Sequence, residues 1–519
     1  MTALNALPRV TLGKGDTSLR EIVAIADGAQ VELAQDALAG MAALQTLIRQ
    51  AIDQGNVIYG LTTGVGDLVT ARLGAADVAA MQLNMLKSHA CGMGAPLAQR
   101  EVRAMMAVMI VSLLQGHSGV GPELVTTLAR MLNQGVIPWS PSKGSVGYLI
   151  ATAHIGLAVF GHGQCGYQGA LLPSDQALAR AGIPLRLPGP REGHALVSGT
   201  YEITALGCLA VADFAALLPL ADAAGAMSLE ALKGNTRGYD ARLHALRPHA
   251  GQQTTARILR RLLTDSDILD KYRDYRVQDA LSLRCIPQIH GAVRDQLAFC
   301  HQVVHTELNS VTDNPVFFIE DGQLTVLPGG NGHGAPIALS LDALAIAIAA
   351  LSTASQARSD RLTNSHLSGL PPFLINAAGG YSGLMIPPYA AAALAGENRS
   401  LAAPASVHTV TTCAGQEDHI SQGVNAARKS LDAIANAVDI VAIEILCAAQ
   451  ALDFHQPLRA SAGSRAVLSV VRPHVPFLTE DRELWRDLAA LRQLIVDGSL
   501  GEALRPILGE DGECHWEVR

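Results

Sequence analysis

Long apolar stretches, broken by short polar loops, dominate the second half of the chain. Between residues 200 and 455 this pattern predicts long helices that are apolar on most faces, as in the centre of a helical bundle. Glycine and proline clusters at 312–315, 329–334 and 379–388 interrupt these helices. The pattern therefore favours a mainly α fold with a long central helical bundle.

The rest of the chain is more mixed. Helical periodicity is present at 72–90, 97–115 and 148–162, and a Pro/Gly/Ser-rich stretch at 137–144 predicts a loop. Alternation at 315–327 predicts a small β-hairpin among otherwise irregular segments. We expect three regions, namely a loop-rich N-terminal domain that carries the active-site loops, a long-helix domain and a small helical end, at 1–200, 201–455 and 456–519.

Composition and charge exclude several functions. The chain has 519 residues, a formal net charge of −8 and no basic cluster, so no nucleic-acid partner is expected. The apolar tracts contain charges such as Glu202, Asp342 and Glu444, which argues against membrane spans. Eight scattered cysteines without a CxxC pair, and no signal-peptide pattern, predict a cytoplasmic location.

Motifs for phosphate binding, zinc-dependent hydrolysis and serine hydrolysis are absent. His301 and His305 are spaced i, i+4 with Glu307 nearby, which could mark one face of a metal site. Two histidines on a solvated helix face is the simpler interpretation. We therefore expect no metal.

Polar loop motifs stand between the apolar helices in a fixed order. They are 59–66 (Tyr-Gly-Leu-Thr-Thr-Gly-Val-Gly), 88–90, 144–147 (Gly-Ser-Val-Gly), 277–279, 282–285, 309–315, 330–334, 404–407 and 416–419 (Gln-Glu-Asp-His). The ordered set resembles the histidine and aromatic amino acid ammonia-lyase family over nearly the whole chain. The resemblance implies the histidine ammonia-lyase-like fold, a homotetramer whose active sites combine loops of several subunits, and a small imidazole amino acid as substrate.

The resemblance ends where the family builds its electrophile. Family members read Gly-Ser-Val-Gly-Ala-Ser-Gly-Asp-Leu-x-Pro-Leu-Ala-His, and the Ala-Ser-Gly cyclises to a methylidene-imidazolone (MIO). This chain passes from Gly147 directly to Tyr148, so three residues are missing. The flanking Asp and Pro are also changed, to Tyr148 and Ala151. We therefore expect no MIO cofactor.

Other positions on the cofactor side differ from the family pattern as well. The departures are Ser198 for the Asn of Asn-Gly-Thr, Leu281 for a Tyr, Gly332 for the Phe of Gly-Asn-Phe-His-Gly, and Met109 and Val111 for an Arg and an Asn. Loss of the tripeptide together with these neighbours indicates one coordinated change.

The substrate side of the pattern is retained. The resemblance implies that Tyr59 is the base that removes the β-proton, and that Glu417 acts with it. It implies that Arg284 holds the substrate carboxylate, for which a guanidinium is suited. His89 and Gln416, with Glu417, match the imidazole-specific pattern, because imidazole and carboxylate groups can hydrogen-bond ring nitrogens.

Further candidates for substrate binding lie in the same segments. They are Ser198 and Asn314 in the motifs, Gly332 as a position that enlarges the pocket, Tyr148, Tyr381 and Tyr389 as aromatic faces for a trimethylammonium, Lys87 beside His89, and His194, where relatives are usually apolar.

The missing electrophile changes the expected chemistry. A base near an α-ammonium removes an N–H proton before the less acidic β-proton, whereas a trimethylammonium has no N–H and departs as a neutral amine. The sequence thus predicts a MIO-independent, ergothionase-like C–N lyase that converts ergothioneine to thiourocanate, or hercynine to urocanate, with loss of trimethylamine. The alternatives are a histidine ammonia-lyase, giving urocanate and ammonia, and a non-catalytic ligand-binding pseudoenzyme.

Overall fold

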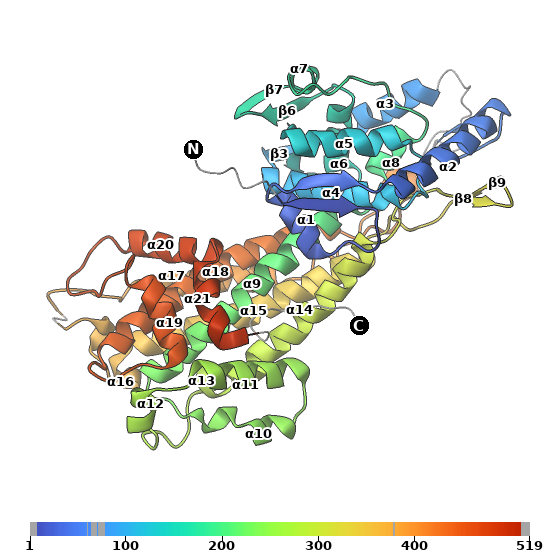
Figure 1. The fold of residues 1–519 in the computed structure, drawn as a ribbon. Coiled ribbons are helices and arrows are strands. Elements are labelled where there is room, and N and C mark those ends of the chain that lie inside the picture. Colours follow the sequence, from blue (N-terminus) through green and yellow to red (C-terminus); the bar gives the residue numbers. More distant parts are fainter. Residues whose placement is uncertain (1–7, 60, 64–69, 71–77, 377–378, 510–519) are drawn as a thin grey trace. The chain divides into compact units, whose positions relative to one another are not determined.

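The computed structural model describes residues 8–59, 61–63, 70, 78–376 and 379–509 (Figure 1). They form two compact units. Unit 1 contains the chain up to Ala212, with Gln302–Leu341 and Pro404–Arg428, and unit 2 contains the remainder. Four long helices pass along the chain from one unit into the other: α9 (Tyr201–Ala231), α14 (Ile286–Leu308), α15 (Ala335–Thr363) and α18 (Gly423–Asp453).

Unit 1 combines short helices with small sheets. Its helices are α1 (Leu19–Ala26), α2 (Gln35–Asp53), α3 (Val78–His89), α4 (Gln99–Leu114), α5 (Pro122–Gln134), α6 (Ile150–Val159), α7 (Ser174–Arg180) and α8 (Glu192–Val197). Its strands are β1 (Arg9–Leu12), β2 (Gln30–Leu33), β3 (Met93–Pro96), β4 (Ile137–Pro138), β5 (Pro141–Lys143), β6 (Gln164–Tyr167), β7 (Ala170–Pro173), β8 (Val316–Glu320) and β9 (Gln323–Leu327). The predicted helices at 97–115 and 148–162 are confirmed as α4 and α6.

The prediction of a loop at 137–144 is wrong, because this stretch contains two short strands. Strand β4 pairs antiparallel with β6 at the edge of the three-stranded sheet β4-β6-β7, and β5 pairs with β3. Pro138 and Pro141 cannot donate to a ladder, yet edge strands tolerate proline because one side of each is not paired. The proline and glycine content concealed this pairing.

The hairpin predicted at 315–327 is confirmed as β8 and β9, which pair in register from Val316–Leu327 to Glu320–Gln323. Phe317 of β8 is fully buried; its amide donates to the His117 carbonyl, and its carbonyl lies 2.9 Å from the His117 Nδ1 atom. It joins a hydrophobic cluster that fixes the loop after α2. The members of the cluster are Leu44, Ile48, Ala51, Ile58, Leu61, Val78 and Phe317.

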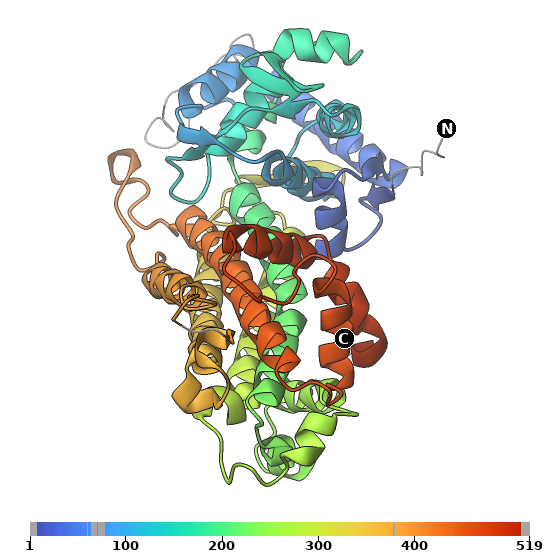
Figure 2. The same ribbon diagram turned by 90° about the vertical axis from the view of Figure 1, so that its left-hand side faces the viewer.

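Unit 2 is almost entirely helical among its described residues. Besides parts of the four long helices it contains α10 (Ala241–Ala245), α11 (Ala250–Leu262), α12 (Asp267–Lys271), α13 (Leu281–Arg284), α16 (Ser365–Ser368), α17 (Pro387–Leu401), α19 (Ala462–Val471), α20 (Leu484–Val496) and α21 (Ser499–Leu508). In this unit α9, α14, α15 and α18 run side by side (Figure 2). This is the central bundle that the apolar tracts predict.

Buried ion pairs join these four helices. Asp222 of α9 accepts hydrogen bonds from His290 Nδ1 at 2.7 Å and Arg294 Nη2 at 2.6 Å, both on α14. Arg358 of α15 donates through Nε and Nη2 to Glu444 of α18, at 2.5 and 2.9 Å. The charged groups are paired and hydrogen-bonded, which is the condition for burying charge in a core.

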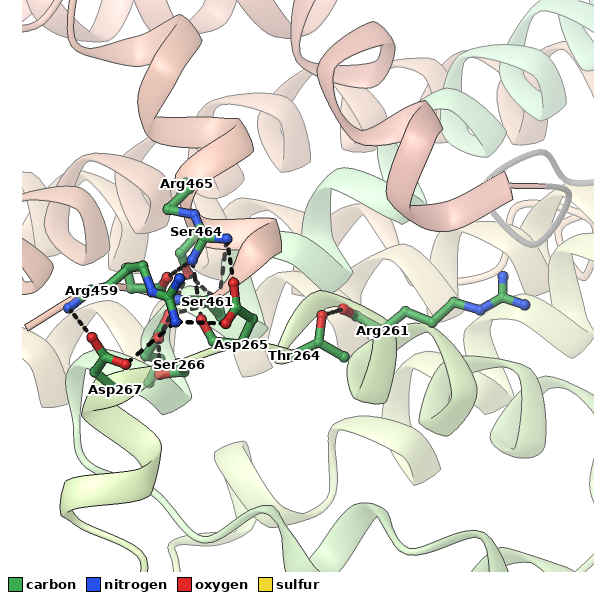
Figure 3. Close-up of polar contacts among 11 residues, drawn as sticks. Arg261, Thr264, Asp265, Ser266, Asp267, Arg459, Ser461, Ser464 and Arg465 are labelled. Carbon is green, nitrogen blue, oxygen red and sulfur yellow. Dashed lines mark hydrogen bonds and ion pairs between the residues drawn. The ribbon is translucent and has the colours of Figure 1, made fainter.

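Polar contacts hold the C-terminal segment of unit 2 to the rest of that unit. Buried Glu230 at the end of α9 accepts hydrogen bonds from Ser266, Ser461 and Ser464. Asp265 lies between Arg459 and Arg465, at 2.7 and 2.9 Å (Figure 3). Ser461 also caps α19 by accepting from the Ser464 backbone amide.

Two helical stretches, Glu192–Ala231 and Ala335–Thr363, are long and apolar enough to cross a membrane. Most of each apolar window is buried inside the structure, as is typical of core helices in a bundle. The expected solvated histidine face on α14 is wrong for His301, which is buried because the helix packs that position inward. No metal-binding group of three or more side chains is found among the described residues.

Candidate active site

A cavity of about 820 Å³ lies within unit 1, where six loops or helix ends meet. It is lined by the end of α3, the turn before α6, α8, and the segments at 59, 314–333 and 412–419. Most of the predicted site residues line it. These are Tyr59, His89, Tyr148, His194, Ser198, Asn314, Gly332, Gln416 and Glu417.

Tyr59 is carried by a tight turn after α2. The buried residues Ile58 and Leu61 on either side belong to the hydrophobic cluster and anchor the turn. Thr62 closes it, since its hydroxyl accepts from the Ile58 amide and donates to the Asn56 carbonyl, both at 2.8 Å. Gly60 and residues 64–66 of the same motif lie outside the described residues.

His89, at the end of α3, presents one defined edge. Its Nδ1 is 2.8 Å from the Met85 carbonyl, which can only accept, so Nδ1 carries the proton. In the neutral ring Nε2 is then a hydrogen-bond acceptor. Ser88 supports this arrangement, because its hydroxyl contacts both His89 Nδ1 and the Met85 carbonyl.

The segment around Gly147 and Tyr148, where three residues of the family pattern are missing, is held by several local hydrogen bonds. Leu149, before α6, has φ = 83°, a conformation that is uncommon for a residue with a side chain. The Ser145 hydroxyl donates to the Tyr148 carbonyl at 3.1 Å. The Tyr148 phenol donates to Glu417 Oε1 at 3.2 Å, and Thr412 donates to Oε2 at 3.0 Å.

Burial and the neighbouring Glu417 carboxylate raise the pKa of Tyr148 well above its ordinary value. Tyr148 is therefore a hydrogen-bond donor at neutral pH and not a base. The residues present do not fit an MIO group, because Gly147 is bonded directly to Tyr148 and no Ala-Ser-Gly stands between them. A Cβ atom at Gly147 would also lie 2.7 Å from the Ser421 hydroxyl.

Ser198 and Asn314 form one wall together. The Ser198 hydroxyl accepts from the Asn314 amide at 3.2 Å and contacts its carbonyl. The Asn314 side chain accepts from the Gly329 amide at 2.8 Å, which holds the loop that contains Gly332. A Cβ atom at Gly332 would lie 3.3 Å from the Thr312 carbonyl, which is a tight contact, so a side chain at this position would crowd the loop.

Glu202 of α9 is buried beside Ser145, in the segment where the three residues are missing. Burial raises the pKa of Glu202 to about 7, and this rise is opposed by Arg428 and by a hydrogen bond with Ser145. Arg428 pairs with Glu101 at 3.4 Å, so two carboxylates share one guanidinium. Glu202 Oε2 has no hydrogen-bond partner, which is consistent with a carboxyl group that keeps its proton.

Four predicted site residues do not line this cavity. Lys87 is exposed on α3. Arg284 is in unit 2, where it lines a separate cavity of about 400 Å³ with Asp279. Tyr381 and Tyr389 are exposed in unit 2, and Tyr389 lines a third cavity of about 710 Å³.

The cavity also contains groups that sequence reasoning missed. They are His333, Cys413, Asp418 and His419. His333 Nε2 lies 3.2 Å from the His419 carbonyl and 3.1 Å from its Nδ1, so His333 donates at this atom. The signal was available, because three of the four residues stand in the motifs that carry the resemblance. Among the lining residues, Glu417 and Asp418 are acidic and none is lysine or arginine.

The fold places the protein among the mainly helical ammonia-lyases and their relatives. It matches histidine ammonia-lyase from Trypanosoma cruzi with a TM-score of 0.92 and 34% identity, over 98% of each chain. It matches the ergothioneine-degrading enzyme ergothionase from Treponema denticola with a TM-score of 0.89 and 26% identity, over 95% of this chain and 99% of that one. The predicted histidine ammonia-lyase-like fold is confirmed.

The sequence relatives define the family. The model for aromatic amino acid lyases matches residues 17–473. Histidine ammonia-lyase from Sorangium cellulosum is 46% identical over 89% of this chain and 91% of its own. That from Natranaerobius thermophilus is 43% identical over 93% and 96%. The chain belongs to the aromatic amino acid lyase family, whose members are carbon–nitrogen lyases.

Proposed function

We propose that this family member is a cytoplasmic, MIO-independent C–N lyase that eliminates trimethylamine from an imidazole amino-acid betaine. The observation that carries the proposal is the direct Gly147–Tyr148 linkage, with the Tyr148 phenol donating to Glu417 inside the cavity. These residues cannot form the electrophile that would activate a primary amine. The amine must then leave because the substrate itself makes it a good leaving group.

A quaternary ammonium meets this requirement. Tyr59, as its tyrosinate, takes the proton from Cβ, and the C–H electron pair forms the Cα–Cβ double bond. The Cα–N bond breaks, and its electron pair leaves with trimethylamine as a neutral molecule. No N–H proton competes for the base, so all of its reactivity is directed at carbon.

The electrostatics of the cavity suit a cationic ligand. The lining residues include Glu417 and Asp418 and neither lysine nor arginine. Tyr59 and Tyr148 add aromatic faces, which attract quaternary ammonium groups. Gly332 lines the cavity without a side chain, so it takes up less of the cavity than the phenylalanine of the family pattern would.

Recognition of the ring favours ergothioneine over hercynine. His89 Nε2 and the Glu417 carboxylate are both acceptors, and the carboxylate retains lone pairs beyond those used by Tyr148 and Thr412. The 2-thioimidazole ring in its thione form carries two N–H donors, whereas neutral imidazole carries one. Two acceptors therefore complement the thione ring more fully.

A second candidate is histidine ammonia-lyase activity. The relatives favour it more strongly than the first, since two chains of that name are 46% and 43% identical, whereas the ergothionase structure is 26% identical. This candidate requires an activating group other than the tripeptide. The acidic cavity and the imidazole-binding pair suit histidine as well.

We further propose a homotetramer that completes the site. Arg284, Tyr381 and Tyr389 belong to unit 2 and do not line the cavity of unit 1, although the family resemblance assigns them to the substrate. Unit 2 exposes apolar side chains on its long helices, among them Phe299 and Ile346. Such faces are typical of subunit interfaces, through which another subunit would supply the carboxylate-binding arginine.

The test is a substrate panel with the purified full-length protein. Ergothioneine, hercynine and histidine are supplied separately, and ultraviolet absorbance of urocanate-type products is followed with chemical detection of trimethylamine and ammonia. Trimethylamine from a betaine supports the proposal. Ammonia from histidine, with betaines untouched, supports the second candidate. Calorimetric binding without any product would identify a pseudoenzyme and overturn both.

A further inference from the structure

His194 lines the cavity, and its ring is held by a buried arginine. Arg191 is fully buried, and its Nη1 contacts His194 Nδ1. The same guanidinium donates through Nη2 to Asp313 Oδ1 at 2.7 Å and through Nε to the Ser118 carbonyl at 3.3 Å. These partners fix its position from several sides.

This contact determines the tautomer of His194. A guanidinium carries only donors and stays protonated at any pH that a folded protein meets. His194 Nδ1 must therefore be the acceptor, and the proton of the neutral ring must be on Nε2. A second proton on Nδ1 would place two cationic N–H groups against each other, so Arg191 disfavours the imidazolium.

The tautomer of His194 is the opposite of that of His89. His89 donates through Nδ1 to a carbonyl and offers a lone pair at Nε2, whereas His194 accepts at Nδ1 and offers an N–H at Nε2. One imidazole in the cavity is an acceptor and the other is a donor. The ring of His194 lies in edge contact with that of Tyr59, with centroids 5.8 Å apart.

Other titratable groups lie on the helices that pack against α8. Helices α3 and α6 pack against α8 and contribute Lys87, His89 and His154. Burial lowers the pKa of His154, whose Nε2 accepts from the Gly92 amide, so this ring is neutral at pH 7. Asp313 balances the charge of Arg191 and leaves the pair formally neutral.

We infer that Arg191 is a positioning residue that fixes His194 as a neutral N–H donor to the phenolate oxygen of Tyr59. The inference rests on the proposed role of Tyr59 as the base. A neutral donor stabilises the tyrosinate without adding a cation to a cavity that must bind an ammonium group. Arg191 would thus supply the orientation of the donor while its own charge stays compensated by Asp313.

The first experiment measures the tyrosinate directly. Ultraviolet absorbance is titrated with pH for the wild type and for His194→Leu, each against the same protein with Tyr59→Phe. Loss of the donor should move the midpoint upward by about one pH unit, which means about tenfold less tyrosinate at neutral pH. His194→Gln retains an N–H and should restore most of the shift. An unmoved midpoint in His194→Leu would overturn the inference.

The second experiment tests Arg191. In Arg191→Gln, His194 becomes free to protonate, so KM for the betaine should rise severalfold below pH ~6.5, where a histidine ordinarily titrates. Arg191→Lys keeps a donor at Nδ1 and should lack this step, as should the double variant Arg191→Gln/His194→Gln. A step that persists in the double variant, or none in Arg191→Gln, contradicts the assignment.

Controls separate folding from positioning. Arg103→Gln removes another guanidinium of unit 1, which donates to the carbonyls of Ile25 and Leu132, and should leave both titrations unchanged. If Arg191→Gln fails to fold because Asp313 is left unpaired, Arg191→Gln/Asp313→Asn removes both charges. The absorbance titration needs no turnover, so an inactive wild type with a shifted midpoint in His194→Leu would defeat the proposed function alone.

Discussion

The two units each bury a histidine, an aspartate and an arginine, but the hydrogen bonds are arranged differently. In unit 2, Asp222 is central and accepts from both His290 and Arg294, while Arg358 contacts His290 Nε2 at 3.4 Å. In unit 1 the arginine is central, because Arg191 donates to both His194 and Asp313.

The difference separates a structural histidine from one that serves a site. Both nitrogens of His290 have protein partners and its ring is fully buried, so it has no edge for a ligand. His194 is nearly as buried, yet its ring lines the cavity. Composition and burial do not distinguish the two; the direction of the hydrogen bonds does. The predictions below test this distinction, in order of decreasing effect.

Replacing Arg358 with Met should affect stability and leave the unit 1 cavity unchanged. It removes two hydrogen bonds to buried Glu444 and leaves that carboxylate without its cation. Breaking a buried pair on one side costs about 3–5 kcal/mol, measurable by urea unfolding. Arg361→Met, on the same helix at a partly exposed position, is the matched control. Equal losses in both variants would show that the network is not structurally important.

Replacing Tyr59 with Phe should have the reverse effect, a loss of activity with little change in stability. Loss of the base should lower kcat about a thousandfold, while the free energy of unfolding changes little. Tyr148→Phe is the matched control, because it removes a phenol from the same cavity that serves as a donor to Glu417. Steady-state kinetics with the betaine would measure both. If Tyr148→Phe is the more damaged enzyme, the roles of the two tyrosines must be exchanged.

Glu202 tests whether unit 1 also resists a buried charge. The pKa of Glu202 rises from 4.5 to about 7 on folding, so the native state binds the proton more tightly than the unfolded chain does. Its contribution to stability is present below pH 4.5 and is lost as pH rises through about 7. The free energy of unfolding of Glu202→Gln should therefore rise relative to that of the wild type by up to about 3 kcal/mol between pH 5 and 8.

Urea unfolding at several pH values would measure this gain. Glu32→Gln, at an exposed ion pair with Arg9, should show little pH-dependent difference from the wild type. A Glu202→Gln difference that stays flat with pH would mean that the pKa of Glu202 does not change on folding.

Replacing Gly332 with Phe should have the smallest effect, on ligand size alone. The side chain would occupy space in the cavity, starting 3.3 Å from the Thr312 carbonyl. Overpacking of this kind costs about 1–3 kcal/mol, so KM for a trimethylated ligand should rise about tenfold or more. Gly332→Ala should show a fraction of this increase. Binding of the ligand without N-methyl groups, measured by calorimetry, should change less.

The sequence predicted the features that depend on local pattern. Long apolar tracts gave the four long helices, and the ordered motifs brought Tyr59, His89 and Glu417 into one cavity. What it could not predict were contacts set by tertiary packing. Arg191 and Asp313 are 122 positions apart, and nothing in either segment specifies that they pair. The tautomer of His194 follows from that pairing, so it could not be predicted from the sequence either.

The donor imidazole at 194 and the acceptor imidazole at 89 are carried by helices that touch through their main chains. A Cβ atom at Gly193 would fall 2.1 Å from the Gln82 carbonyl of α3, and the His194 amide donates to the Gln82 side chain at 2.9 Å. The distance between the His89 and His194 rings is thus set by a direct backbone contact, which is possible because Gly193 has no side chain. A Gly193→Ala substitution would therefore push α3 and α8 apart and change the spacing of the two imidazoles that face the ligand.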